Sequence, residues 1–83
     1  MLFLESLQYH IALTINPDLA GAHYNLGLAY TKERSTDRAI EHFEAAARLA
    51  PTNAVFLDTL ARAYEMRTIA GKVEHKADSL KKR

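Results

Sequence analysis

The sequence predicts an all-α fold made of antiparallel helical hairpins that stack side by side. Apolar residues recur at helical spacing, as Leu26, Ala29 and Tyr30 do, on one face at i, i+3 and i+4. The chain has two prolines, Pro17 and Pro51, and the interval between them recurs at other pairs of positions. Runs of β-branched residues with alternating polarity are missing from the sequence, so strands have no support.

The interval between the two prolines marks an internal repeat. Shifting the sequence by this interval aligns six identical and two conservative pairs, which are Ala12/Ala46, Pro17/Pro51, Ala20/Ala54, Leu26/Leu60, Ala29/Ala63, Tyr30/Tyr64, Tyr9/Phe43 and Ile15/Leu49. Most of these positions are small, apolar or aromatic, as positions that touch neighbouring helices are. A fixed period of this length is typical of solenoid folds.

Five helices are expected, at residues 3–15, 20–33, 37–49, 54–67 and 71–82. Each proline ends a helix, because the residue before a proline is pushed out of the α region. Asp18 and Thr52 follow the prolines and are expected to cap the next helices, and Ser35 or Thr36 is expected to cap the third. The loops are short, so successive helices should pack antiparallel.

Residues 20–53 carry a spaced pattern of small, apolar and aromatic residues. Its members are His23, Leu26, Gly27 and Tyr30 in the first helix and Ala39, Phe43, Ala46 and Pro51 in the second. This pattern resembles the tetratricopeptide repeat, whose length of about 34 residues equals the interval between the prolines. His23 stands in place of the family's first aromatic residue. The resemblance implies a short right-handed solenoid in which Gly27 and Ala61 allow close helix approach.

The segments on either side resemble the family less closely. Residues 54–83 match a first helix through Leu57, Leu60, Ala61 and Tyr64, but Ala77 stands where the second helix should carry an aromatic residue. Residues 5–17 match only the second half of a unit. The expected organisation is therefore one domain, with a half repeat at 3–19, a complete repeat at 20–53 and a degenerate or capping repeat at 54–83.

The sequence has no pattern typical of catalysis, of cofactor binding or of a metal site. Its histidines are His10, His23, His42 and His75, and no two stand at i, i+4 or beside a carboxylate at metal-motif spacing. Nucleophile-elbow and phosphate-loop motifs are also missing from the sequence. We therefore expect neither an enzyme, nor a cofactor, nor a metal ion.

The family resemblance implies a concave groove, lined by the first helix of each unit, that takes an extended segment or helix of a partner protein. The groove candidates are Tyr24, Asn25, Leu28, Lys32, Asp58, Arg62 and Met66. Some family members use an asparagine at the position of Asn25 to bond the backbone of a bound peptide. A carboxylate clamp is not expected, because Val55 and Thr59 stand where it needs a lysine and an arginine. Asp58 and Arg62, at i, i+4, can equally pair with each other.

The first helix predicts self-association, because apolar residues surround most of it and such a helix is normally buried on nearly all sides. Its self-association candidates are Phe3, Leu7 and Ile11. The alternative is that the chain is a fragment or stub of a longer solenoid. A stub of that kind would have no independent ligand. For the binding module we expect a protein or peptide partner, a homo-oligomer and a cytoplasmic location.

Nucleic-acid and membrane partners are not expected. The net charge is +1, and the basic residues of 72–83 are typical of a solvated helix end. No stretch approaches the roughly 20 apolar residues that span a bilayer.

Overall fold

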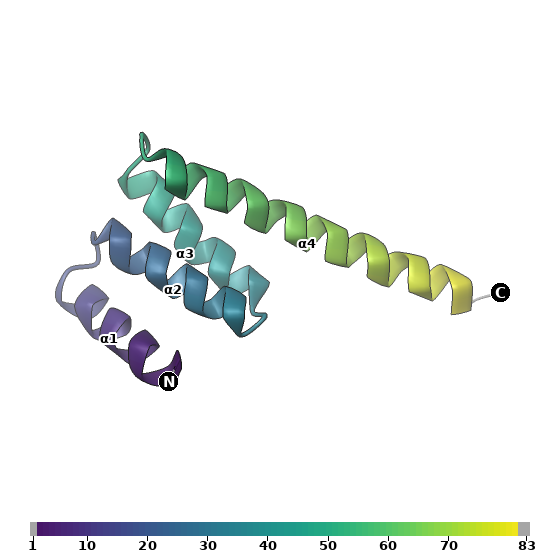
Figure 1. Cartoon of the computed structure of the whole chain (residues 1–83), viewed down its shortest axis with the longest axis horizontal. Helices are drawn as coiled ribbons and strands as arrows, with labels where there is room; N and C mark the ends of the chain where they lie inside the picture. The colour runs from purple at the N-terminus through teal and green to yellow at the C-terminus, as the bar shows by residue number, and fades with distance from the viewer. Residues whose placement is uncertain (1, 82–83) are drawn as a thin grey trace.

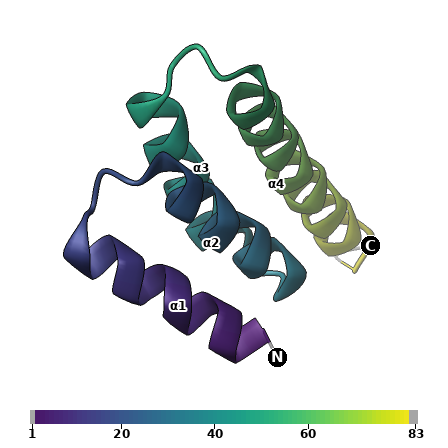
Figure 2. The same ribbon diagram turned by 60° about the vertical axis from the view of Figure 1, so that its left-hand side comes forward.

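The computed structural model describes the backbone of residues 2–81 and the side chains of residues 6–69. Its four helices are α1 (Leu2–Ile15), α2 (Ala20–Lys32), α3 (Thr36–Leu49) and α4 (Ala54–Lys81). Successive helices run antiparallel, and each packs on the next (Figures 1 and 2). The expectation of an all-α fold is confirmed: residues 2–81 contain no strand.

The prediction of a separate fifth helix at residues 71–82 is wrong. Residues 54–81 form one continuous helix, α4, whose far half extends beyond the other helices (Figure 1). No proline interrupts this stretch, and a glycine inside a helix, here Gly71, costs about 1 kcal/mol relative to alanine. Thr68 also satisfies its hydroxyl within the helix, by donating to the carbonyl oxygen of Tyr64 at 3.0 Å.

The expected caps after the prolines are also wrong. Leu19, not Asp18, precedes α2, and the Asp18 N–H donates to Oδ1 of Asn16 at 3.1 Å inside the turn. α4 is capped by Asn53 in place of Thr52, because the Phe56 N–H donates to Asn53 Oδ1 at 3.1 Å. The sequence pattern predicted where each turn lies, but the geometry of the turn decides which side chain accepts the hydrogen bond.

The turn between α2 and α3 is tight. Arg34 takes a left-handed backbone conformation there, with φ of 63°. The N–H groups of Arg34 and Ser35 bond back to the carbonyl oxygens of Thr31 and Tyr30. Ser35 does precede α3 as expected, but its side chain makes no capping hydrogen bond. The turn therefore folds α3 directly back along α2.

The core lies where α3 packs between α2 and the first half of α4. Leu26 and Phe43 are its largest fully buried side chains. Gly27 allows the close approach, because a Cβ on Gly27 would lie 2.8 Å from Cζ of Phe43 and closer still to two other ring atoms. Ala61, expected to play the same role in the next unit, is exposed among the described residues.

The internal repeat is visible in two equivalent contacts. The Tyr30 hydroxyl of α2 lies 3.4 Å from Nε2 of His10 on α1. The Tyr64 hydroxyl of α4 donates a hydrogen bond to the Glu44 carboxylate on α3. Both pairs are 20 residues apart, and shifting one pair by one repeat period gives the other. The contact between α1 and α2 is therefore repeated between α3 and α4.

Candidate protein-binding surface

The groove candidates lie on two helices that both pack on α3. Tyr24, Asn25, Leu28 and Lys32 belong to α2, and Asp58, Arg62 and Met66 belong to the first half of α4. The two helices are joined by an aromatic stack, in which the rings of Tyr24 and Phe56 are 4.9 Å apart and inclined by 28°. This stack brings together residues that are far apart in the sequence.

Tyr24 is more than a surface residue. Its side chain is half-buried, and its ring also lies 5.9 Å from that of Phe43 in the core. Tyr24 therefore helps to hold α2, α3 and α4 together, and replacing it will lower stability. Phe56, its stacking partner, was not identified from the sequence, because the position equivalent to it in the preceding unit is Ala22.

The other candidates are of mixed character, and all of them except Asn25 are exposed. Leu28 and Met66 are apolar and exposed, whereas Asn25 is half-buried. Lys32 is exposed at the end of α2. Nε of Arg62 lies 3.1 Å from Oδ2 of Asp58 with both side chains largely in solvent, so these two residues do pair with each other. Exposed i, i+4 pairs of this kind contribute about 0.3–0.5 kcal/mol.

Polar contacts position α4 on α3. Besides the Tyr64–Glu44 hydrogen bond, Nη1 of Arg67 lies 3.6 Å from Oδ1 of Asp37, and its guanidinium lies 5.4 Å from the Tyr64 ring centre. The hydrogen bond to Glu44 raises the pKa of the Tyr64 phenol above its ordinary value. These contacts link α4 to α3 at the surface, beside the apolar packing of Ala63 and Leu60 in the core.

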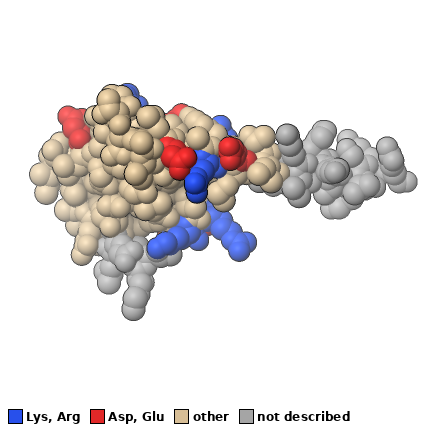
Figure 3. Space-filling view, turned by 45° about the horizontal axis from the view of Figure 1, so that its top comes forward, with Lys and Arg blue, Asp and Glu red and all other residues tan. Residues whose placement is uncertain are grey.

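The apolar stripe of α1 consists of Leu7, Ile11 and Ile15, which follow one another at i, i+4 spacing. Their exposed fractions are 44%, 52% and 80%, which leaves a continuous apolar face on α1. Phe3, the third self-association candidate, lies outside the described side chains. Across the face shown in Figure 3, most of the described surface is uncharged, and acidic and basic side chains occur in small groups.

Three histidines that are scattered in the sequence meet in the structure. His10 of α1 and His23 of α2 both lie beside His42 of α3, at 6.5 and 5.4 Å between ring centres. Burial, and the positive charges of His23 and His10 when protonated, lower the pKa of His42, while Glu41 partly opposes the shift. The sequence analysis missed this cluster, because its members lie on three helices. Among the described residues, no three His, Asp or Glu side chains are arranged to hold a metal ion.

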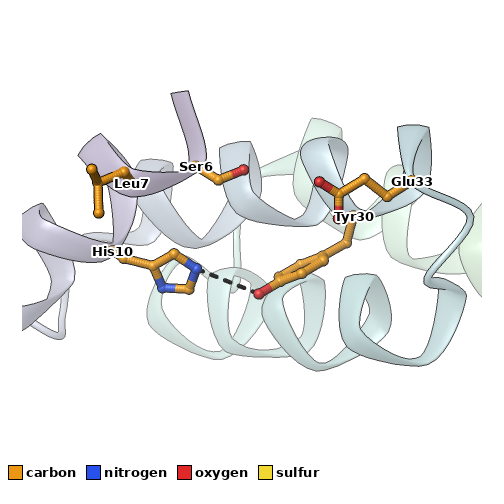
Figure 4. Close-up of a pocket in the computed structure, with 5 residues that line it drawn as sticks. All are labelled: Ser6, Leu7, His10, Tyr30 and Glu33. Carbon is orange, nitrogen blue, oxygen red and sulfur yellow. Dashed lines mark hydrogen bonds between the residues drawn. The ribbon is translucent and has the colours of Figure 1, made fainter. Parts of the chain in front are cut away.

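A small hollow lies beside this cluster, between α1 and α2. It is lined by Ser6, Leu7, His10, Tyr30 and Glu33, has a volume of about 190 Å³ and is open to solvent (Figure 4). The contact between His10 and the Tyr30 hydroxyl forms part of its wall. The sequence analysis predicted no site here. In the described part of the chain no helix has the length and apolar character needed to cross a membrane.

Comparison with known proteins supports the family resemblance. The family model of the tetratricopeptide repeat matches residues 20–53, which span α2, α3 and the turns that follow them. No curated protein matches the chain. The prediction of a tetratricopeptide repeat at residues 20–53 is confirmed. Such repeats generally mediate protein–protein interaction and are typically not enzymes.

Proposed function

We propose that this chain, built around a tetratricopeptide repeat, is a binding module that takes a peptide segment or a helix of a partner protein along α2 and the first half of α4. The observation that supports the proposal is the Tyr24–Phe56 stack at 4.9 Å, through which α2 meets the first half of α4. In this proposal the exposed candidates of both helices act as one surface.

The chemistry of the surface suits a partner segment with both apolar and polar groups. Leu28 and Met66 offer exposed apolar contacts, 37% and 54% exposed. The side-chain amide of Asn25 has a donor and an acceptor, which match the two hydrogen-bonding groups of a peptide backbone. Lys32 and the Asp58–Arg62 pair supply charges of both signs that can select a partner's charge pattern.

In this proposal the domain has three parts. Residues 3–19 form a half repeat, residues 20–53 the complete repeat, and residues 54–83 a second unit whose two expected helices are merged. The equivalent contacts Tyr30–His10 and Tyr64–Glu44 support this division, because they recur after one period. A right-handed solenoid is the arrangement that such a division implies.

Binding is tested once a partner segment has been identified by affinity capture and mass spectrometry. Leu28→Ala, Met66→Ala and Asn25→Ala should each weaken binding of the purified segment, with the most buried contact losing about tenfold, which is about 1.4 kcal/mol. Arg48→Ala, at an exposed position of α3, is the matched control and should bind normally. Unchanged dissociation constants for all three groove variants would show that the segment binds elsewhere.

A second function, self-association through the apolar stripe of α1, is favoured by the exposure of Leu7, Ile11 and Ile15. A second copy of the chain would cover this face. Further repeats would cover it too if the chain is a piece of a longer solenoid. Sedimentation equilibrium at about 100 μM should show a species heavier than the 9.3 kDa monomer, because association depends on concentration.

The matched variants for self-association lie on one helix. Leu7→Glu and Ile11→Glu should shift the sedimentation profile toward monomer, whereas Gln8→Glu, which adds the same charge at an exposed polar position, should not. A wild-type chain that sediments as a monomer at this concentration excludes the homo-oligomer. The groove proposal is unaffected by that result.

A further inference from the structure

The histidine cluster joins three parts of the chain. Nδ1 of His23 lies 3.1 Å from Nδ1 of His42, which links α2 to α3. Nε2 of His23 lies 2.9 Å from the carbonyl oxygen of Pro17, which links α2 to the preceding turn. The His42 ring also stacks on Tyr30, at 5.5 Å and 13°. His23, which departs from the aromatic pattern of the repeat, thus bonds on both sides of its ring.

These contacts fix where the protons are in the neutral pair. A carbonyl oxygen accepts hydrogen bonds and does not donate them, so His23 Nε2 must carry the hydrogen. A neutral imidazole has one N–H, and His23 Nδ1 is therefore an acceptor. His42 Nδ1 must then be the donor in the 3.1 Å contact, which leaves His42 Nε2 without a hydrogen. One chain of hydrogen bonds therefore runs from His42 Nδ1–H to His23 Nδ1, and from His23 Nε2–H to the carbonyl oxygen of Pro17.

The pair has room for one more proton and not for two. A proton added at His42 Nε2 leaves the Nδ1–H donor and the His23 acceptor in place. A second proton must go to His23 Nδ1, where two N–H groups would face each other at 3.1 Å and two cations would lie side by side. The contact cannot survive that state, so it breaks when both rings are protonated.

The charged and titratable groups that face His42 come from three helices. His23 of α2 and His10 of α1 favour the neutral form of His42, and Tyr30 of α2 stacks on its ring. On α3 itself, Glu41 favours the cation, and the Arg38 guanidinium lies 5.9 Å from the Tyr30 ring centre. The groups of α4 that contact α3, Tyr64 and Arg67, do so at Glu44 and Asp37.

We propose that the His23–His42 contact is a proton-sensitive clasp, which holds α2 and the turn before it against α3 and opens when acid protonates both rings. Burial and the neighbouring histidines lower the pKa of His42 in the folded chain, so the unfolded chain binds more protons. Stability is therefore complete above the ordinary histidine pKa of about 6.5 and falls as the pH drops through it toward the lower folded pKa. The clasp is a property of the fold and does not depend on what the groove binds.

The first test is the proton position in each ring. Long-range ¹⁵N–¹H correlation spectra at about pH 7.5, where free histidine is neutral, should show His23 as the Nε2–H tautomer and His42 as the Nδ1–H tautomer. Lowering the pH should change the signals of both rings together, because the rings share one hydrogen bond. Finding both rings in the Nε2–H form, or titrating independently like free histidine, overturns the clasp.

The second test is the pH dependence of stability. Between about pH 8 and pH 5, the folding constant of the wild type should fall several-fold, because each unit by which folding lowers a pKa is worth a factor of ten. His42→Asn keeps an amide donor near the Nδ1 position and cannot be protonated, so it should show a much flatter dependence. The proposal is overturned if the stability of His42→Asn depends on pH as steeply as that of the wild type, or if the stability of the wild type does not change with pH.

Two further variants complete the experiment. His23→Gln retains a donor for the Pro17 carbonyl oxygen and removes the contact between the two histidine rings. It should therefore flatten the pH dependence of stability even if His42→Asn folds poorly. His10→Gln is the matched control, because His10 is exposed and its ring touches the pair from the edge. His10→Gln should keep most of the wild-type pH dependence, and a complete loss of that dependence would place the switch at His10 instead.

Discussion

α2 and the first half of α4 are two copies of one sequence pattern with different burial. Leu26 of α2 is fully buried, whereas Leu60, one repeat period later, is half-buried. Gly27 lies against the Phe43 ring, whereas the equivalent Ala61 is exposed. α2 packs between α1 and α3, and among the described helices α4 has a packed neighbour on the α3 side. The same sequence pattern is therefore buried more deeply in α2, which has packed helices on both sides, than in α4.

The two helices agree where both have a neighbour. Ala29 and Ala63 are both buried, and the hydroxyls of Tyr30 and Tyr64 both reach the preceding helix. The clearest difference is between Gly27, which meets Phe43 of the following helix, and the exposed Ala61. In a stack of repeats, the stability of each unit is accordingly the sum of its own packing and of the interface with its neighbours.

The largest expected effect is at the centre of the core. Phe43→Ala should lower the free energy of unfolding by about 3–5 kcal/mol, because it leaves a cavity among fully packed neighbours. Phe56→Ala, at the half-buried edge of α4, should cost clearly less. Urea denaturation of both variants compares the core with the edge of α4 directly, and equal losses would show that the edge at Phe56 is as well packed as the core around Phe43.

The next effect compares equivalent positions of the repeat. Gly27→Leu should cost about 1–3 kcal/mol or more, since even a Cβ would meet the Phe43 ring. Ala61→Leu should change stability by no more than about 0.5 kcal/mol, because its side chain points into an uncovered region. Chemical denaturation measures both. A large loss at Ala61 would mean that another helix or another copy packs there.

The two glycines of α2 provide a smaller and opposite effect. Gly21→Ala should stabilise the chain by about 0.4–1 kcal/mol, because a Cβ there meets nothing within 4 Å and the unfolded chain loses freedom. The same change at Gly27 should destabilise it. Thermal unfolding should therefore show a raised midpoint for Gly21→Ala and a lowered one for Gly27→Ala, and midpoints that move in the same direction would contradict the packing of Gly27.

The smallest effect lies on the exposed side of α4. A double-mutant cycle on Asp58 and Arg62, each changed to alanine, should give a coupling of about 0.3–0.5 kcal/mol in the absence of a partner. High salt should remove it, since both side chains are largely in solvent. A coupling several times larger would indicate that the pair is shielded by a contact that the isolated fold does not have.

Much of the fold was determined by the sequence alone. The two prolines and the helical spacing located the turns, and the fixed repeat period marked Leu26 and Phe43 as packing positions. The resemblance to the tetratricopeptide repeat added Gly27. These features are local or repeat at a fixed interval, so they can be found before any tertiary contact is known. The family match at residues 20–53 depends on the same residues.

Tertiary structure decided the rest. α4 runs through Gly71 because no neighbouring segment in the described chain requires a break there, and a single glycine costs too little to impose one. The Tyr24–Phe56 stack and the His23–His42 contact join different helices, so they depend on how each helix is rotated and how closely it approaches the next. Helical periodicity determines which face of a helix is apolar, but the packing of the helices determines which side chains come into contact. The two sites proposed for this chain both depend on contacts between side chains of different helices.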